Sequence, residues 1–177
     1  MSVVINGTGS ISGLSNVGGV SSAQSGSVIQ TVSAAFNTYV SITSTSLTDT
    51  GITATITPQF STSKILVTIS AHLGLALAAS ASSGGTINIL RNSTAIYVAD
   101  RIPYGRFGIA SATANWRFDT NSSFVILDSP ATTSSITYKL QGALLSTASS
   151  AEFLVNDYEN SSTSTNGCTI TLMEIAQ

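Results

Sequence analysis

From Val28 onward, short runs rich in Val, Ile and Thr alternate with turn-forming residues. Such runs predict β-strands, because β-branched side chains pack well on a pleated sheet, while Gly, Pro, Asn, Asp and Ser favour the turns between them. We expect ten or eleven strands, at residues 28–34, 38–43, 52–57, 64–71, 86–90, 94–99, 115–119, 123–127, 136–142, 152–155 and 169–175. Strands at this spacing are typical of sandwiches and barrels.

Two connections can be predicted in more detail. Arg91-Asn92-Ser93 separates two of the strands and has the composition of a hairpin turn. The Ala-rich stretch Leu73–Ala81 contains Gly74 and lacks charged partners, so we expect it to continue the preceding strand rather than form a helix. That strand would then run into a loop at residues 82–85, whose sequence is Ser-Ser-Gly-Gly.

The scarcity of charge supports an all-β fold. Only 8% of the residues are charged, about a third of the usual share. Ser and Thr take their place, with 55 of the 177 residues. Helix surfaces rely on Lys, Glu and Arg, whereas Thr favours strands and Ser favours turns. We therefore expect an antiparallel β-sandwich without helices.

The first 27 residues differ from the rest of the chain. Met1–Ser27 contains six glycines, no charged residue and no aromatic residue. Its apolar residues recur between glycines in groups too small to form a core. Such a segment is either disordered or ordered on a partner's surface. We interpret residues 1–27 as an extended N-terminal arm and residues 28–177 as one β-domain.

Charge, cysteine content and hydropathy exclude several classes of protein. Six basic residues and a net charge of −2 cannot track a nucleic-acid backbone. One cysteine, Cys168, allows no intramolecular disulfide, and one histidine allows no Cys/His metal cluster. No apolar run is long enough to span a membrane, and no secretory signal begins the sequence. We expect the chain to fold in the cytoplasm where it is made.

Catalysis is not indicated. His72 is the sole imidazole, and no Gly-x-Ser-x-Gly motif accompanies it. Carboxylates that a glycosidase would need lie at predicted strand ends or in loops, where acidic residues commonly serve turns: Asp100, Asp119, Asp128, Asp157 and Glu159. The stretch Asp157–Asn160 has oxygen ligands but not the spacing of an EF-hand. We expect no enzyme, no cofactor and no metal.

One segment combines arginines with aromatic residues. It contains Arg101, Tyr104, Arg106, Phe107, Trp116 and Arg117. This composition is typical of the central contacts of protein interfaces, and also of sugar-binding platforms. The structural alternative places Trp116 in the core and pairs the arginines with Asp100 and Asp119. We favour a subunit interface, and keep the ligand site and the structural role as alternatives.

Several segments together resemble the small virion surface proteins of tailed bacteriophages, notably those of cyanobacteria and marine bacteria. The resemblance lies in Ile56–Val67, Ile89–Ile96, Phe124–Ser134, Tyr138–Gln141 and Thr169–Ala176, and the start Ile5–Leu14 is also similar. It implies a jelly roll that assembles as a homotrimer. No catalytic residue comes with the family. Unlike long fibres of that group, the chain has no shaft repeat.

The sequence and the resemblance together predict a virion role. We expect a trimeric capsid decoration (cement) protein, attached through residues 1–27 to the major capsid protein or another virion protein. A tail-fibre or receptor-binding tip is the main alternative. A carbohydrate-binding module that contacts a host surface glycan is the other. We expect the protein on the surface of the capsid or tail, after synthesis in the host cytoplasm.

Overall fold

The computed structural model describes residues 24–78, 82–106, 115–147, 150–157 and 163–177. Within these ranges the chain forms ten strands. They are β1 (Val28–Thr38), β2 (Val40–Ile42), β3 (Thr48–Ile56), β4 (Lys64–Ala78), β5 (Ser82–Arg91), β6 (Thr94–Arg106), β7 (Asn115–Asp128), β8 (Ile136–Leu144), β9 (Glu152–Val155) and β10 (Thr163–Ile175). No helix long and apolar enough to cross a membrane occurs in the described ranges.

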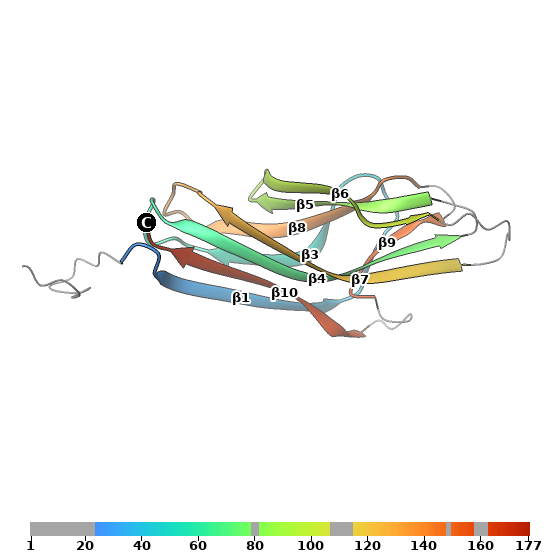
Figure 1. Ribbon diagram of the computed structural model, residues 1–177, viewed down its shortest axis with the longest axis horizontal. Helices are drawn as coiled ribbons and strands as arrows, with labels where there is room; N and C mark the ends of the chain where they lie inside the picture. Colours follow the sequence, from blue (N-terminus) through green and yellow to red (C-terminus); the bar gives the residue numbers. More distant parts are fainter. Residues whose placement is uncertain (1–23, 79–81, 107–114, 148–149, 158–162) are drawn as a thin grey trace, which may run out of the picture.

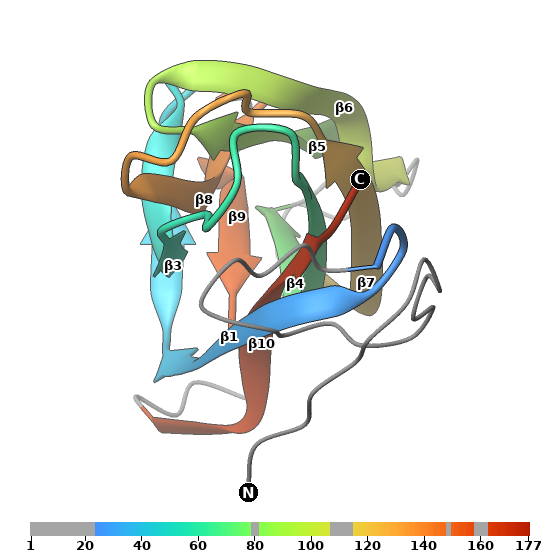
Figure 2. The ribbon, with the colours of Figure 1, turned by 90° about the vertical axis from the view of Figure 1, so that its left-hand side faces the viewer.

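The strands form two sheets, and every pairing is antiparallel. The first sheet has the order β1-β10-β4-β9-β2, with β7 along the other side of β4. The second sheet has the order β3-β8-β5-β6. Figure 1 shows the long strands running along the molecule, and Figure 2 shows the two layers from one end. The predicted all-β antiparallel sandwich is confirmed.

The strand order identifies the sandwich as a jelly roll. Without the short strands β2 and β9, the sheets read β1-β10-β4-β7 and β3-β8-β5-β6. Numbered along the chain, these eight strands are in the order 1-8-3-6 and 2-7-4-5. This is the arrangement of two Greek keys wound into eight strands.

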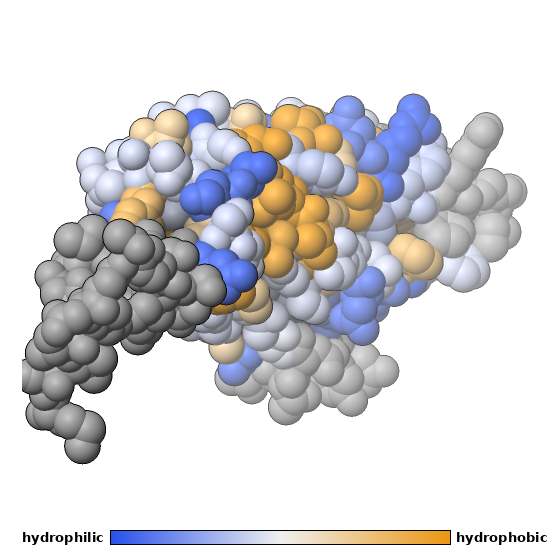
Figure 3. Space-filling view, turned by 60° about the vertical axis from the view of Figure 1, so that its left-hand side comes forward, coloured by the Kyte–Doolittle hydropathy of each residue, from blue (hydrophilic) through white to orange (hydrophobic). Residues whose placement is uncertain are grey.

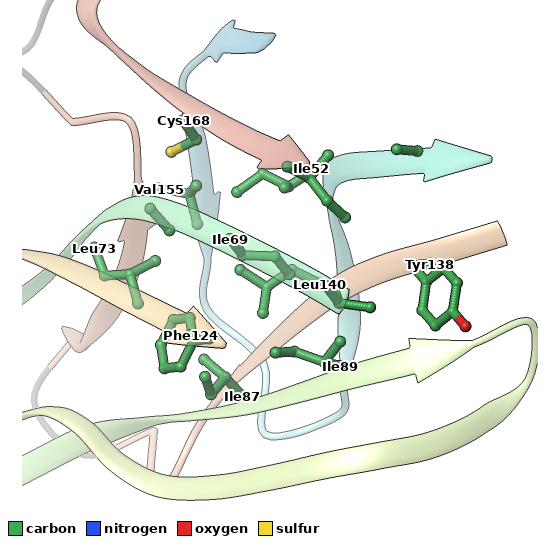
Figure 4. Packing of buried hydrophobic residues seen from close by; sticks show 14 of the residues in the cluster. Ile52, Ile69, Leu73, Ile87, Ile89, Phe124, Tyr138, Leu140, Val155 and Cys168 are labelled. Atoms are coloured by element: carbon green, nitrogen blue, oxygen red, sulfur yellow. The ribbon is translucent and has the colours of Figure 1, made fainter. Parts of the chain in front are cut away.

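The core lies between the two sheets. Alternate residues of β4, such as Ile65, Ile69 and Leu73, are fully buried and face inward. They meet buried side chains of the second sheet, including Ile87 and Leu140, as Figure 4 shows. Period-two alternation along strands therefore builds the core, as expected for a sheet with one buried face.

Two glycines shape the centre of the sandwich. Phe153 of β9 is fully buried, and its ring packs over Gly85 of β5 and Gly142 of β8. A Cβ atom at Gly85 would lie 2.3 Å from the Phe153 ring, and one at Gly142 would lie 2.4 Å from it. The absence of a side chain at both positions therefore makes room for the ring.

The structure corrects two expectations and confirms two. The predicted strands 115–119 and 123–127 form one strand, β7, because Asn121 between them continues the pairing with β4 opposite His72. The predicted loop 82–85 belongs to β5, where its glycines serve packing instead of a turn. The strand continuation beyond Leu73 is confirmed as far as Ala78. The β5–β6 hairpin is also confirmed, with a left-handed Asn92 (φ 53°) at its turn.

The first strand begins where it was predicted. β1 begins at Val28, and residues 24–27 form a turn closed by a hydrogen bond from Ser27 N to Gln24 O (2.9 Å). The turn is joined to the C-terminal end of the domain, because Gly26 N donates to Ala176 O (2.8 Å). The rest of the proposed arm, residues 1–23, lies outside the described residues.

Candidate functional site

The candidate site lies along one edge of the sandwich, where the two sheets meet. β6 is the last strand of the second sheet, and β7 flanks β4 in the first. In the described part of the chain, β6 pairs with β5 and β7 with β4, and neither pairs on its other side. Tyr97 of β6 contacts Phe124 of β7 across the gap between the sheets. The edge therefore combines two long strands with open backbone hydrogen-bonding groups.

The predicted arginine–aromatic segment falls on these two strands. Arg101 and Tyr104 lie on β6, which ends at Arg106, and Trp116 and Arg117 lie at the start of β7. Phe107 is outside the described residues, as is the Arg106 side chain. The fold thus places both halves of the segment on neighbouring edge strands.

Arg101 and Tyr104 contact each other. The Arg101 guanidinium lies over the Tyr104 ring, 4.9 Å from its centroid, and the ring also packs close to Gly84. The backbone of Arg101 is left-handed, with φ 65°. Its neighbour Asp100 accepts a hydrogen bond from Thr86 Oγ1 (2.9 Å). The guanidinium covers the ring face on which a sugar would stack, so this pair fits a protein contact better than a glycan platform.

Arg117 forms an ion pair within its own chain. Its Nε contacts the carboxylate of Asp157, which follows β9 and is almost completely buried. Burial raises the pKa of Asp157, and the positive charge of Arg117 opposes that rise. Arg117 therefore has an acidic partner, Asp157, that was not predicted from the sequence. Its partner lies forty residues away in sequence.

Exposed apolar side chains are frequent on these two edge strands. Of the nine large hydrophobic residues that are most exposed in the described ranges, six belong to β6 or β7. They are Tyr97 (37%), Val98 (59%), Tyr104 (41%), Phe118 (45%), Val125 (65%) and Leu127 (52%). Figure 3 shows apolar side chains gathered on the described surface between polar ones. We call these six residues the edge patch.

Five members of the edge patch were missed in the sequence: Tyr97, Val98, Phe118, Val125 and Leu127. The run Phe124–Leu127 is apolar at every position, so one face of that strand must expose apolar groups if the other faces the core. A continuous apolar run in a strand usually indicates burial on both faces. Only the strand order shows that β7 stands at an edge.

Three of the carboxylates considered for catalysis, Asp100, Asp128 and Asp157, have partners within the chain. Asp128 accepts two hydrogen bonds from Arg91 Nη1 (2.9 and 3.0 Å) and one from Tyr138 Oη (2.7 Å). It thereby ties β7 to β5 and β8 of the second sheet. Among the described residues, no group of three or more His, Cys, Asp or Glu side chains is placed to hold a metal ion.

Comparison with known proteins identifies no family. No family model matches the chain, and no curated protein matches it either. The similar solved structures include latent PorU from Porphyromonas gingivalis (TM-score 0.36, 11% identity), of which 14% is covered by 88% of this chain. They also include a VP2 subviral particle of infectious bursal disease virus (TM-score 0.36, 11% identity), of which 39% is covered by 85% of this chain. Similarity at this level carries no functional argument.

Proposed function

We propose that the protein is a structural subunit of a virus particle and that copies of the chain meet through the β6–β7 edge. The observation that carries this proposal is the edge patch. Long edge strands with exposed apolar side chains favour association with another chain. The contact gives hydrogen-bond partners to the unpaired backbone groups and removes the apolar side chains from water. Edge strands of a stable monomer are usually protected by charges or bulges.

Low charge favours the same role. With 8% charged residues and a net charge of −2, copies repel one another weakly. Arginine and aromatic residues beside the patch match the composition of strong interface contacts. Jelly rolls occur in capsids and in lectins, so the fold is compatible with a virion role without deciding it.

In its finer form, the proposal is a trimeric capsid decoration protein of a tailed bacteriophage. Residues 1–27 would attach it to the major capsid protein or to another virion protein. The resemblance to small phage virion proteins supports this form, as does the layout of an arm followed by one β-domain. A tail-fibre or receptor-binding tip remains the alternative location.

Light scattering on the full chain tests the assembly. We expect three times the chain mass of 18.1 kDa at micromolar concentration. Phe118→Ser should lower the mass or raise the concentration needed for assembly, because it removes an exposed ring from the edge patch. Leu47→Ser is the matched control, since Leu47 is similarly exposed (41%) but lies outside β6 and β7. A monodisperse monomer, or equal effects of both substitutions, would refute the interface.

Two further measurements separate the alternatives. Quantitative mass spectrometry of purified particles gives the copy number: hundreds of copies indicate the capsid, and a few tens or fewer indicate the tail. A glycan array with the full chain and with Phe118→Ser tests the carbohydrate-binding module. Glycan binding that Phe118→Ser abolishes while the mass in solution stays unchanged would assign the edge patch to a glycan instead.

A further inference from the structure

At one end of the first sheet, apolar side chains surround a single lysine. The strand register brings together Val28 of β1, Met173 and Ile175 of β10, and Lys64 and Leu66 of β4. Figure 2 shows these three strands beside one another, with the C-terminus at the end of β10. We call these five residues the Lys64 surface.

The Lys64 surface faces away from the core. Ile65 and Glu174, which pair with each other, are fully buried between the sheets. Because strand residues alternate between the two faces of a sheet, their neighbours along β4 and β10 lie on the outer face. Val28, at the margin of the group, is 55% exposed. Leu127 of the edge patch pairs with Leu66, so the two surfaces adjoin, but they share no residue.

The ammonium group of Lys64 has no counter-charge in the described part of the chain. Within the described ranges, neither an ion pair nor a hydrogen bond reaches its side chain. The acidic residues nearest in register are Glu174 and Asp128, which both pair with Ile65. Both lie on the inward side of the sheet and accept hydrogen bonds from other side chains. The Lys64 surface therefore combines apolar groups with one unopposed positive charge.

We propose that the Lys64 surface binds an extended segment of another protein in which one carboxylate lies between apolar side chains. Charge complementarity selects this occupant. A wholly apolar partner would cover the ammonium group without giving it a counter-charge, which costs free energy. A wholly acidic partner would place charged groups against Val28 and its apolar neighbours. A carboxylate between apolar side chains pairs with Lys64 and removes the apolar groups from water at the same time.

The position of the surface indicates where the segment comes from. Three neighbouring strands span about 10 Å, a distance that three or four extended residues can cross. The turn at residues 24–27 immediately precedes Val28, so a protein held by the arm would lie beside the Lys64 surface. The source of the segment rests on the proposed function: it is the virion protein to which residues 1–27 attach. The chemistry of binding does not rest on it.

A display library of random heptapeptides tests the chemistry of the occupant. The full chain is the bait, and Lys64→Glu is the variant for comparison. We expect the enriched peptides to carry Asp or Glu between apolar residues and to lose roughly tenfold or more in affinity for Lys64→Glu, because the variant repels their carboxylate. Enriched peptides without a carboxylate, equal binding to both baits, or no enrichment would refute the proposal.

Nuclear magnetic resonance with one enriched peptide locates the binding. The amide signals of Val28, Leu66 and Ile175 should shift, whereas those of Thr55 and Lys139 on the second sheet should not. Shifts confined to the second sheet would overturn the assignment of the surface.

Matched variants separate charge from general surface effects. Lys64→Arg keeps the charge and should retain binding, and Lys64→Ala should weaken it. Lys139→Ala is the control, since Lys139 is paired with Asp49 Oδ2 (2.8 Å) and lies on the second sheet; it should bind as the unmodified chain does. Loss of binding in Lys139→Ala equal to that in Lys64→Ala would contradict the proposal.

Two further readouts separate the proposal from the proposed function. Lys64→Glu should keep its melting temperature and its mass in solution, because it breaks no ion pair and lies outside the edge patch. A changed mass would place Lys64 in the contact between copies and overturn the separate surface. Attachment to particles that lack the protein should weaken in Lys64→Glu. Peptide binding without any effect on attachment would overturn the virion source and leave the binding chemistry standing.

Discussion

The rings of Tyr97 on β6 and Phe124 on β7 lie 6.0 Å apart between centroids and are tilted by 51°. The two strands belong to different sheets, so this contact closes one side of the sandwich. Phe124 is 7% exposed and belongs to the core, whereas Tyr97 is 37% exposed. The pair therefore connects the core with the edge patch.

Removing Phe124 should weaken the closure of the sandwich. We expect Phe124→Ala to lower the free energy of unfolding by about 3–5 kcal/mol, because it leaves a cavity between the sheets. Tyr97→Ala should cost less, since Tyr97 is partly exposed. A double-mutant cycle in urea should give a coupling of about 0.5–1.5 kcal/mol. A coupling near zero would show that the two rings do not support each other.

Gly142 should not tolerate a side chain while Phe153 is present. The Cβ of Gly142→Ala would lie 2.4 Å from the Phe153 ring, so overpacking should cost about 1–3 kcal/mol. Phe153→Leu alone should also destabilise the domain. The double variant should be more stable than the sum of the two losses predicts, because the smaller side chain frees the space. Strictly additive losses in chemical denaturation would contradict this packing.

The strands could be predicted from the sequence because their period-two patterns are local. The packing role of the glycines could not be predicted. Gly84 and Gly85 have the composition of a loop, and only the position of Phe153 shows that Gly85 lies within a strand. The ring comes from β9, which is far away along the chain. Likewise, the three polar residues between the two predicted halves of β7 have the composition of a turn, and only their pairing with β4 shows that they belong to one continuous strand.

The ion pair between Arg117 and Asp157 should stabilise the β-domain. Arg117→Ala leaves a nearly buried carboxylate without its cation. We expect a loss of roughly 2–3 kcal/mol, below the usual 3–5 for a fully buried pair, because Arg117 remains partly exposed. Adding Asp157→Asn should recover part of the loss. Thermal melting at two protein concentrations separates the explanations: a concentration-dependent loss would point to a contact between chains instead.

Glu174 should make the stability of the domain depend on pH. It is fully buried and accepts hydrogen bonds from Gln30 Nε2 (2.6 Å) and from the backbone N–H groups of Gln59 (2.8 Å) and Phe60 (3.2 Å). Burial by itself raises the pKa of Glu174, but these hydrogen bonds outweigh it and hold the pKa below its ordinary value of 4.5.

The direction of the effect follows from this lowered pKa. The carboxylate contributes stability above the ordinary pKa of glutamate, and that contribution is lost as the pH falls through the lower pKa of the folded state. Glu174→Gln should lower the free energy of unfolding by about 1–3 kcal/mol at pH 7 and flatten its decline in acid. Asp49→Asn is the control: its side chain is 54% exposed, and we expect a change of about 0–1 kcal/mol.

The arm should be dispensable for folding. Deleting residues 1–23 retains the turn at Gln24–Ser27 and its bonds to Ala176. We therefore expect the melting temperature to stay within a few degrees. Binding to particles that lack the protein should be abolished if residues 1–27 form the attachment. Unfolding of the shortened chain, or unchanged binding, would contradict the assignment of the arm.

In the candidate site, as in the fold, contacts within one strand could be predicted from the sequence, but contacts between distant segments could not. Residues close in sequence, such as Arg101 and Tyr104, could be grouped correctly because they lie on one strand. The partner of Arg117 could not, since Asp157 follows a strand of the other half of the chain. The exposure of Val125 and Leu127 could not be predicted either, because both are apolar in sequence and only the strand pairing shows that they face outward from the sheet, opposite in parity to the buried Phe124.

The hydrogen bond from Gly26 to Ala176 bears on where a foreign peptide or enzyme can be added to the protein. It holds the beginning and the end of the β-domain at one pole. If residues 1–27 attach the protein to a particle, a peptide fused after Ala176 would emerge beside the attachment. The connection between β2 and β3, which contains the exposed Leu47, borders Leu144 through the bond from Leu144 N to Ser44 O. Under the same condition, an insert there would lie away from the attachment (Figure 1), so epitopes or enzymes intended to face solution belong in that loop.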